Sequence, residues 1–524
     1  MTINSATINK TLINSLFCKH CIHIDILKEQ TQCNQINCVC NENISFSSLL
    51  DFYSNLYFHM DNINLVNYET LILFGAFQNN QAIRKEITTL WNSHLEAEEY
   101  NSNEHLVIKK SSIELITNNL KESITNEDFL IRSMNWLFVL DASLESFRRH
   151  LEGSRDPNIN KPFFKTTRGL ILFRRKLGLN DYLINDEGLI PPVDPNYLTL
   201  RNNIQNFYLA KEKYNYYDVA HLNLTNGTSK RINRENISEL KIGFFPGNYK
   251  FEDYRWDFDN NSMTDEIYFN FLDVENKDAY HKNIKDTLLQ MLEENPDIII
   301  FPELFAPKDL QDEIIRTTKV IKREKKRNKQ NLNTFLVLPG SFHIKDTSNK
   351  IYNSSTIANG SGQEIFSVNK MNKFKIQKGK ENIGILDVFQ NKDGIEKCAF
   401  DKREIRLIET PIARIAIFIC VDLLNFNIEE VLIDRHVDLI FVMTMTNRPA
   451  SGKFLRRMQE LGERNHSTII ICNNLGLDTV STDIEKKGAY RIVVYFPGLK
   501  EPYRSNKEFA VLSIKQMIEL AQIS

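Results

Sequence analysis

The chain has 524 residues, more than one hydrophobic core usually supports, so two domains are expected. Its 65 lysines and arginines nearly balance its 67 aspartates and glutamates, so no overall charge favours nucleic acid as a partner. The first ten residues lack a basic region followed by an apolar core, and no run of about 18 apolar residues occurs. These features predict a cytoplasmic protein that neither spans a membrane nor depends on nucleic acid.

Five of the eight cysteines lie within the first forty residues. Cys18 and Cys21 have the spacing of a zinc knuckle, and two of Cys33, Cys38 and Cys40 would complete a tetrahedral set. In a cytosolic chain such a cluster favours metal ligands or free thiols over disulfides. We predict a structural zinc at Cys18, Cys21, Cys33 and Cys38, with buried thiols that act as small apolar residues as the alternative.

Residues 46–214 show mostly helical periodicity. Helices are expected over 106–124 and over 125–144, where apolar residues recur every three or four positions. A short basic stretch that includes Arg174 and Arg175 is interleaved with apolar residues, and it is interpreted as a solvated face because a nucleic-acid site needs a wider basic field. We assign residues 1–235 to a mainly α-helical domain with no function indicated by its sequence.

A polar, turn-rich stretch over 223–236 marks the domain boundary. After it, short apolar runs that predict strands alternate with amphipathic runs that predict helices. The expected strands are 240–245, 298–301, 335–338, 353–358 and 413–422, and the expected helices are 278–294 and 311–327. This alternation predicts a mixed α/β domain over residues 236–524.

Two reactive side chains follow buried strands in this second domain. Pro302 stops the strand at 298–301, which leaves Glu303 at the strand's carboxyl end. Cys420 stands near the end of the apolar run 413–422. Open α/β sheets keep their chemistry at such strand ends. Either residue alone would be interpreted as a solvated loop glutamate or an inert core cysteine, so their joint occurrence carries the prediction.

Together with Lys370, these residues resemble the nitrilase (carbon–nitrogen hydrolase) superfamily. The similarity is carried by Phe-Pro-Glu at 301–303, by the spacing from Tyr352 to Lys370, and by Ile-Cys-Val-Asp at 419–422. It runs from about residue 239 to the C-terminus. It implies an α-β-β-α sandwich of two packed sheets, and at least a homodimer.

The resemblance also implies roles for individual residues. Glu303 would be the general base, Lys370 the oxyanion-stabilising lysine and Cys420 the nucleophile, with Lys373 as the competitor of Lys370. Some members carry a second glutamate after the lysine that positions substrate and water, and Glu381 lies in the corresponding region.

Cleaving an amide requires a nucleophile stronger than water, and a thiolate supplies it when its pKa falls well below about 8.5. We expect the charge of Lys370 to lower the pKa of Cys420 and to stabilise the tetrahedral oxyanion. Glu303 would accept the thiol proton and pass it to the departing amine.

The sequence therefore predicts a hydrolase of a small-molecule C–N bond, an amide before a nitrile, with no cofactor for catalysis. Three alternatives stay open. They are glutamine-fed amide transfer, for which no ATP-binding loop is visible, a catalytically idle assembly scaffold, and an effector or sensor module of a bacterial anti-phage system.

Overall fold

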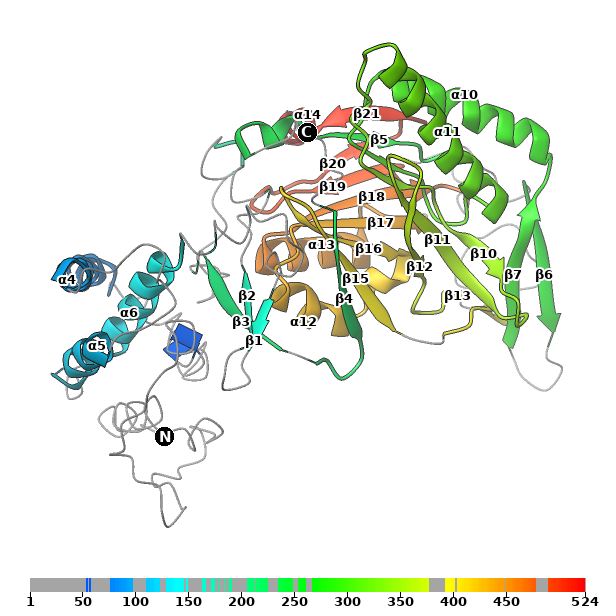
Figure 1. Cartoon of the computed structure of the whole chain (residues 1–524). Helices are drawn as coiled ribbons and strands as arrows, with labels where there is room; N and C mark the ends of the chain where they lie inside the picture. Colours follow the sequence, from blue (N-terminus) through cyan, green and yellow to red (C-terminus); the bar gives the residue numbers. More distant parts are fainter. Residues whose placement is uncertain are drawn as a thin grey trace. The chain divides into compact units, whose positions relative to one another are not determined.

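A computed structural model of the chain, shown in Figure 1, describes the following residues: 53, 54, 56, 57, 76–97, 110–122, 129–145, 148, 163–165, 171–174, 179, 183, 188–190, 204, 206–211, 213–224, 234–247, 253–260, 266–376, 392–400, 403–446, 448–476 and 489–523. The chain divides into two compact units. The first consists of residues 1–176 and 195–212, and the second of residues 177–194 and 213–524.

The N-terminal unit combines helices with a small sheet. Its helices are α4 (Ala76–Ala97), α5 (Lys110–Glu122) and α6 (Phe129–Ser143), and its antiparallel strands are β1 (Phe163–Lys165), β2 (Ile171–Arg174) and β3 (Phe207–Ala210). The carboxylate of Asp141 on α6 accepts the backbone N–H groups of Asn206 and Phe207 at 3.0–3.1 Å, which ties this helix to β3. Arg174 is only 3% exposed, so its assignment to a solvated face was wrong.

The C-terminal unit contains two seven-stranded sheets. The first has the order β10-β11-β9-β8-β5-β21, with β12 also paired to β11, and the second has the order β20-β19-β18-β17-β16-β15-β4. The strands of the first sheet are β5 (Lys241–Phe244), β8 (Ile298–Ile300), β9 (Leu336–Leu338), β10 (Phe342–Lys345), β11 (Ile351–Asn359), β12 (Glu364–Asn369) and β21 (Ala510–Ser513). Those of the second are β4 (Asp218–Asn223), β15 (Glu404–Glu409), β16 (Arg414–Ile419), β17 (Leu439–Met445), β18 (Thr468–Asn474), β19 (Ile492–Tyr495) and β20 (Tyr503–Ser505).

The two sheets share one apolar core, and helices cover their other faces. Ile298 and Ile300 of β8 join the core that also contains the second sheet, whereas Ile299 packs in a separate cluster with α10 (Lys277–Glu293) and α11 (Lys308–Arg327). This alternation follows from the two-residue period of a strand. The second sheet packs against α12 (Asn427–Asp434) and α13 (Gly452–Asn465), on its side of the unit in Figure 1. The predicted mixed α/β architecture is therefore confirmed.

The second sheet includes a strand that precedes residue 236, where the C-terminal domain was predicted to begin. Strand β4 pairs in parallel with β15, in the register Asp218 to Glu404. This strand falls within the stretch that the sequence assigns to the N-terminal domain. Its partner lies almost two hundred residues later in the chain, so no local pattern reports the pairing.

A smaller sheet of four strands borders the functional site. Its order is β13-β14-β7-β6, and its strands are β6 (Tyr254–Asn260), β7 (Glu266–Val274), β13 (Lys375–Ile376) and β14 (Asp393–Glu396). The other elements of this unit in the described residues are η3 (Arg234–Glu239), η6 (Cys420–Leu424) and α14 (Ile514–Ile523). None of the helices in the described part of the chain combines the length and apolar character that crossing a bilayer requires.

Candidate active site

Glu303 is held in a tight loop at the end of β8. Leu304, the residue after it, has a left-handed φ of 52°. The loop packs against Gly340, whose φ is 86° and where a Cβ atom would lie 2.6 Å from the carbonyl oxygen of Pro302. The N–H of Ser341 donates to that same carbonyl at 3.2 Å. Glycine is therefore required at 340, and the loop keeps Glu303 buried at 1% exposure.

Cys420 lies at the end of β16, a strand with every residue buried. Such a continuous apolar run is typical of a central parallel strand, and β16 pairs in parallel with β17. Cys420 itself has a φ of 50° and begins the short helix η6. A left-handed conformation at a residue other than glycine costs on the order of 1–3 kcal/mol, and such residues are enriched at functional sites.

Lys370 follows β12 directly, and the backbone on both sides of it is fixed. Its N–H donates to the carbonyl oxygen of Asn353 at 2.8 Å. The next N–H, that of Met371, donates to the buried carboxylate of Asp422 at 3.0 Å. Asp422 thus binds backbone, and it links the lysine loop to the cysteine turn.

The ammonium of Lys370 bridges two buried carboxylates. Its Nζ atom lies 2.7 Å from Oε1 of Glu303 and 2.7 Å from Oε2 of Glu396. The Nδ2 group of Asn353 donates to Oε1 of both carboxylates at 3.0 Å. The N–H of Met445 donates to the other oxygen of Glu303 at 2.9 Å. These contacts fix the orientation of both carboxylates around one cation.

A histidine supports the second carboxylate from behind. The N–H of Phe271 donates to Nδ1 of His343 at 2.7 Å, so the ring proton of neutral His343 is on Nε2. That atom lies 2.9 Å from Oε1 of Glu396 and donates to it. The other oxygen of Glu396 accepts the N–H of Phe374 at 2.9 Å. The buried carboxylate of Glu396 is thus hydrogen-bonded on both oxygens.

The charges of this cluster reinforce one another. Burial alone would lower the pKa of Lys370, but the carboxylates of Glu303 and Glu396 outweigh it and hold this pKa well above its usual value. Burial would likewise raise the pKa of Glu396, yet Lys370 and His343 hold it well below its ordinary range. Both groups therefore stay charged at neutral pH.

The pKa of Cys420 departs from expectation. Burial, followed by the nearby carboxylate of Glu303, raises the thiol pKa well above its usual value, and Lys370 only partly opposes them. The charge of Lys370 does lower this pKa as predicted, but burial and Glu303 outweigh it, so the thiol pKa is not low. The resting group is a thiol hydrogen-bonded to Glu303.

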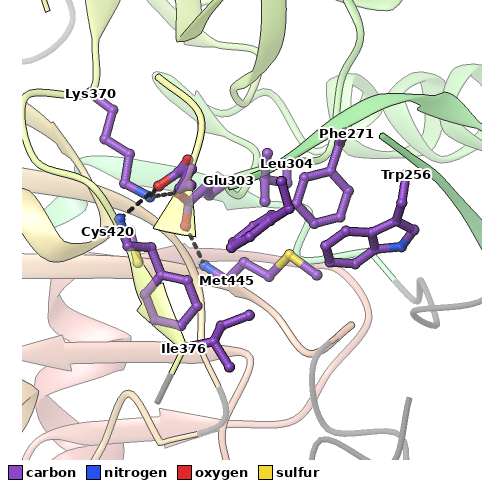
Figure 2. A pocket seen from close by; sticks show the side chains of 11 residues that line it. Trp256, Phe271, Glu303, Leu304, Lys370, Ile376, Cys420 and Met445 are labelled. Atoms are coloured by element: carbon purple, nitrogen blue, oxygen red, sulfur yellow. Dashed lines mark hydrogen bonds and ion pairs between the residues drawn. The ribbon is translucent and has the colours of Figure 1, made fainter. Parts of the chain in front are cut away.

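These groups line one pocket with an empty volume of about 320 Å³. Figure 2 shows Lys370, Cys420 and Glu303 together, with the rings of Trp256 and Phe271 across the pocket from them. The eleven described residues that line it are Trp256, Phe269, Phe271, Glu303, Leu304, Lys370, Phe374, Ile376, Glu396, Cys420 and Met445.

The structure thus brings Glu303, Lys370 and Cys420 together, while their catalytic roles stay predictions. It also separates the two lysines, because the ammonium of Lys373 lies over the rings of Tyr268 and Phe400, 5.7 Å from each centroid. Glu381 lies outside the described residues, as do Cys18, Cys21, Cys33 and Cys38.

The sequence analysis missed Glu396. This residue comes from β14, which pairs in parallel with β7 at a register that aligns Glu396 with Phe269. The stretch around it shows neither a long apolar run nor a motif. The only available signal was a glutamate two residues before Cys398 in a polar insertion after Lys370.

His343, Glu396 and Cys398 are the described residues that most resemble a metal-ligand set, with donor atoms within 4.8 Å of one another. Their contacts argue against a cation there. The Nε2 proton of His343 already serves Glu396, and the Lys370 ammonium lies against the same carboxylate. A divalent ion would meet that positive charge at close range.

Comparisons with known proteins give similarity at the level of structure. No family model matches the sequence, and no curated protein does. Members of the nitrilase superfamily are among the solved structures that it resembles. Nit3 of Saccharomyces cerevisiae, a member of branch 10 of the nitrilase superfamily, is 13% identical, with 54% of this chain and 93% of that chain covered and a TM-score of 0.34.

Two further structures are similar to the same extent. An amidase from Nesterenkonia sp. is 14% identical, with 55% of this chain and 94% of that chain covered and a TM-score of 0.31. The glutamine-dependent NAD+ synthetase from Acinetobacter baumannii is 16% identical over 52% of this chain, with a TM-score of 0.32. This chain spans only 45% of the synthetase. The function proposed below therefore depends on the contacts within the pocket.

Proposed function

We propose that this protein hydrolyses the C–N bond of a small amide through a thioester on Cys420. The observation that carries the proposal is the Lys370 ammonium, held 2.7 Å from the carboxylate of Glu303 in the pocket that Cys420 also lines. A nucleophile, a base and a fixed positive charge at one pocket are the groups that acyl transfer needs. The order Glu303, Lys370, Cys420 along the chain supports membership of the nitrilase superfamily.

In the first step, the thiol proton of Cys420 moves to Glu303 as Sγ attacks the carbonyl carbon. The raised pKa of Cys420 means that the thiolate forms only when an electrophile is in place. Lys370 then stabilises the negative oxygen of the tetrahedral intermediate, an interaction worth about 3–4 kcal/mol per donor. When the C–N bond breaks, the proton on Glu303 leaves with ammonia.

In the second step, Glu303 takes a proton from water, which attacks the thioester carbon. The C–S bond breaks, the thiol regains its proton, and a carboxylic acid is released. Glu396 and Asn353 contribute to both reaction steps by holding Lys370 and Glu303 in position. One amide and one water thus yield one acid and one ammonia.

The test is ammonia release from a panel of primary amides and the matching nitriles, with Cys420→Ala beside wild type. We expect Cys420→Ala to lower kcat by at least about 10⁴-fold, as for other catalytic nucleophiles. Cys472→Ala is the matched control, since Cys472 is equally buried and its Sγ contacts the carbonyl oxygen of Ile300. Turnover by Cys420→Ala at the wild-type rate would refute the proposal. Turnover of nitriles but not of amides would refute the assignment of an amide as the substrate.

Glu303→Gln separates the base from the nucleophile. Glutamine keeps the shape of the side chain but cannot accept the thiol proton or pass it to the leaving amine, so ammonia release should fall by about 10²–10⁴-fold, the contribution of a general acid–base group. Turnover by Glu303→Gln at the wild-type rate would remove Glu303 from the proposed first step.

Two further expectations stay predictions. A homo-oligomer would give a light-scattering mass of at least twice the 61.2 kDa of one chain. A structural zinc would appear in elemental analysis of the purified protein, and the quadruple change of Cys18, Cys21, Cys33 and Cys38 to serine would remove it.

A further inference from the structure

The pocket has two chemically different ends. At one end lie the groups proposed to react, which are Glu303, Lys370, Glu396 and Cys420. At the other end Figure 2 shows the rings of Trp256 and Phe271. All other described lining residues are apolar: Trp256, Phe269, Phe271, Leu304, Phe374, Ile376 and Met445. A substrate that fits both ends has one polar reacting group and an apolar remainder.

The charges at the reacting end are already paired with one another. Lys370 contacts Glu303 and Glu396 at 2.7 Å each, and two carboxylates with one ammonium leave a net charge of −1. Among the eleven described lining residues, these three are the charged ones. A second negative charge on the substrate would meet this excess without a free cation, in a site that is largely withdrawn from water.

The aromatic end is a packed wall with one face toward the pocket. The ring centroids of Trp256 and Phe271, which are paired across β6 and β7, lie 4.0 Å apart. Phe258 stacks on Trp256 at 5.7 Å, and Phe269 lies 5.6 Å from it. Rings packed in this way present a continuous apolar surface, whereas sites for organic cations surround the charge with several separate ring faces. The wall therefore suits a neutral, flat group.

We infer that the substrates are neutral primary amides with an aryl or arylalkyl acyl group, an inference that rests on the proposed function. The amide carbonyl lies at Cys420 and Lys370, and the ring of the acyl group packs against Trp256 and Phe271. Hydrolysis converts the amide and water into the aryl-bearing carboxylate and ammonium.

Glutamine is disfavoured by the same argument. Its acyl chain carries a carboxylate, and the one cation among the described lining residues, Lys370, already contacts Glu303 and Glu396. An uncompensated buried charge costs several kcal/mol, so the pocket selects against it.

The experiment compares kcat/KM for phenylacetamide, acetamide, glutamine and betaine amide with the full-length wild-type chain. We expect phenylacetamide to exceed acetamide by at least about tenfold, the lower end of the selectivity that apolar contacts provide. Glutamine and betaine amide should be poorer than acetamide. Trp256→Ala should reduce the phenylacetamide advantage about tenfold with less effect on acetamide. Leu272→Ala, which removes an exposed side chain of β7 outside the pocket lining, should keep it.

A preference for glutamine or for betaine amide would overturn the inference while leaving the proposed hydrolase intact, as would equal kcat/KM values for phenylacetamide and acetamide. If no amide is turned over, calorimetric binding to Cys420→Ala decides the inference separately. Tighter binding of phenylacetamide than of acetamide and glutamine would then support the pocket assignment and refute the hydrolase. Equal or absent binding of all three would overturn both.

Discussion

Two of the buried charge clusters in the C-terminal unit differ in what surrounds them, one around Lys370 and the other around Arg414. Lys370 and Arg414 are 3% and 1% exposed, and both pair with a buried glutamate at the edge of a core strand. Arg414 donates to Glu409, which also accepts from Nδ1 of His221 at 2.9 Å. By burial alone, neither cluster is distinguishable as a functional site.

Their surroundings separate them. The guanidinium of Arg414 also donates hydrogen bonds to the backbone carbonyl oxygens of Arg435 and His436, so its donors are used within the folded chain. Burial holds the pKa of His221 below its usual value despite the contact with Glu409. One guanidinium and one carboxylate then balance. The Lys370 cluster instead keeps one excess carboxylate and borders a pocket with a thiol. A reactive site thus differs from a structural ion pair by what its charges face.

Arg414→Met should lower stability without removing the chemistry. It leaves Glu409 buried without its cation, and breaking such a pair costs about 3–5 kcal/mol. We expect the free energy of unfolding in urea to fall by this amount, while turnover per folded molecule stays within about twofold. A selective loss of turnover with unchanged stability would mean that the Arg414 cluster is also part of the active site.

Asp422→Asn should remove a pH dependence of stability. Burial raises the pKa of Asp422 to about 7, so between about pH 4 and pH 7 the native carboxyl holds a proton that the unfolded chain has lost. The free energy of unfolding of wild type therefore falls relative to Asp422→Asn as pH rises through this range, on the order of 4 kcal/mol in total, and the difference is constant above it. Urea unfolding of both proteins from pH 4 to pH 8 measures this. A pH-independent difference would contradict the burial of this carboxyl.

Lys370→Met is the counterpart of Arg414→Met in the other cluster. Removal of an oxyanion-stabilising donor lowers kcat by about 10²–10³-fold, whereas KM should change little because the acyl group binds elsewhere in the pocket. Steady-state kinetics with the best amide of the panel measures the split. Comparable turnover by both methionine variants, corrected for the folded fraction, would erase the functional distinction between the clusters.

His343 offers the smallest and most specific test. His343→Asn places an acceptor near the N–H of Phe271 but withdraws the donor from Glu396, while His343→Gln can still donate to Glu396. Because a hydrogen bond to a charged group is worth about 1.5–3 kcal/mol, kcat should fall about tenfold or more in the asparagine variant and recover partly in the glutamine variant. Equal kinetics of the two variants would exclude a positioning role for His343.

Local sequence determined the two strands whose carboxyl ends carry Glu303 and Cys420. The apolar run before Pro302 and the run before Cys420 each predict a buried strand, and both predictions match the structure as β8 and β16. Strand formation depends there on neighbouring residues, and in the first strand also on the proline that ends it. Each residue can therefore be placed at a strand end from its own chain segment.

Tertiary structure alone decided what surrounds them. Glu396 reaches Lys370 because β14 pairs with β7, and the aromatic wall arises from the pairing of β6 with β7. It also decided that the pKa of Cys420 is raised, since burial and Glu303 outweigh a lysine that two carboxylates already neutralise. Pairing between distant strands and the loss of water on burial are properties of the folded chain, so the local pattern of residues does not contain them.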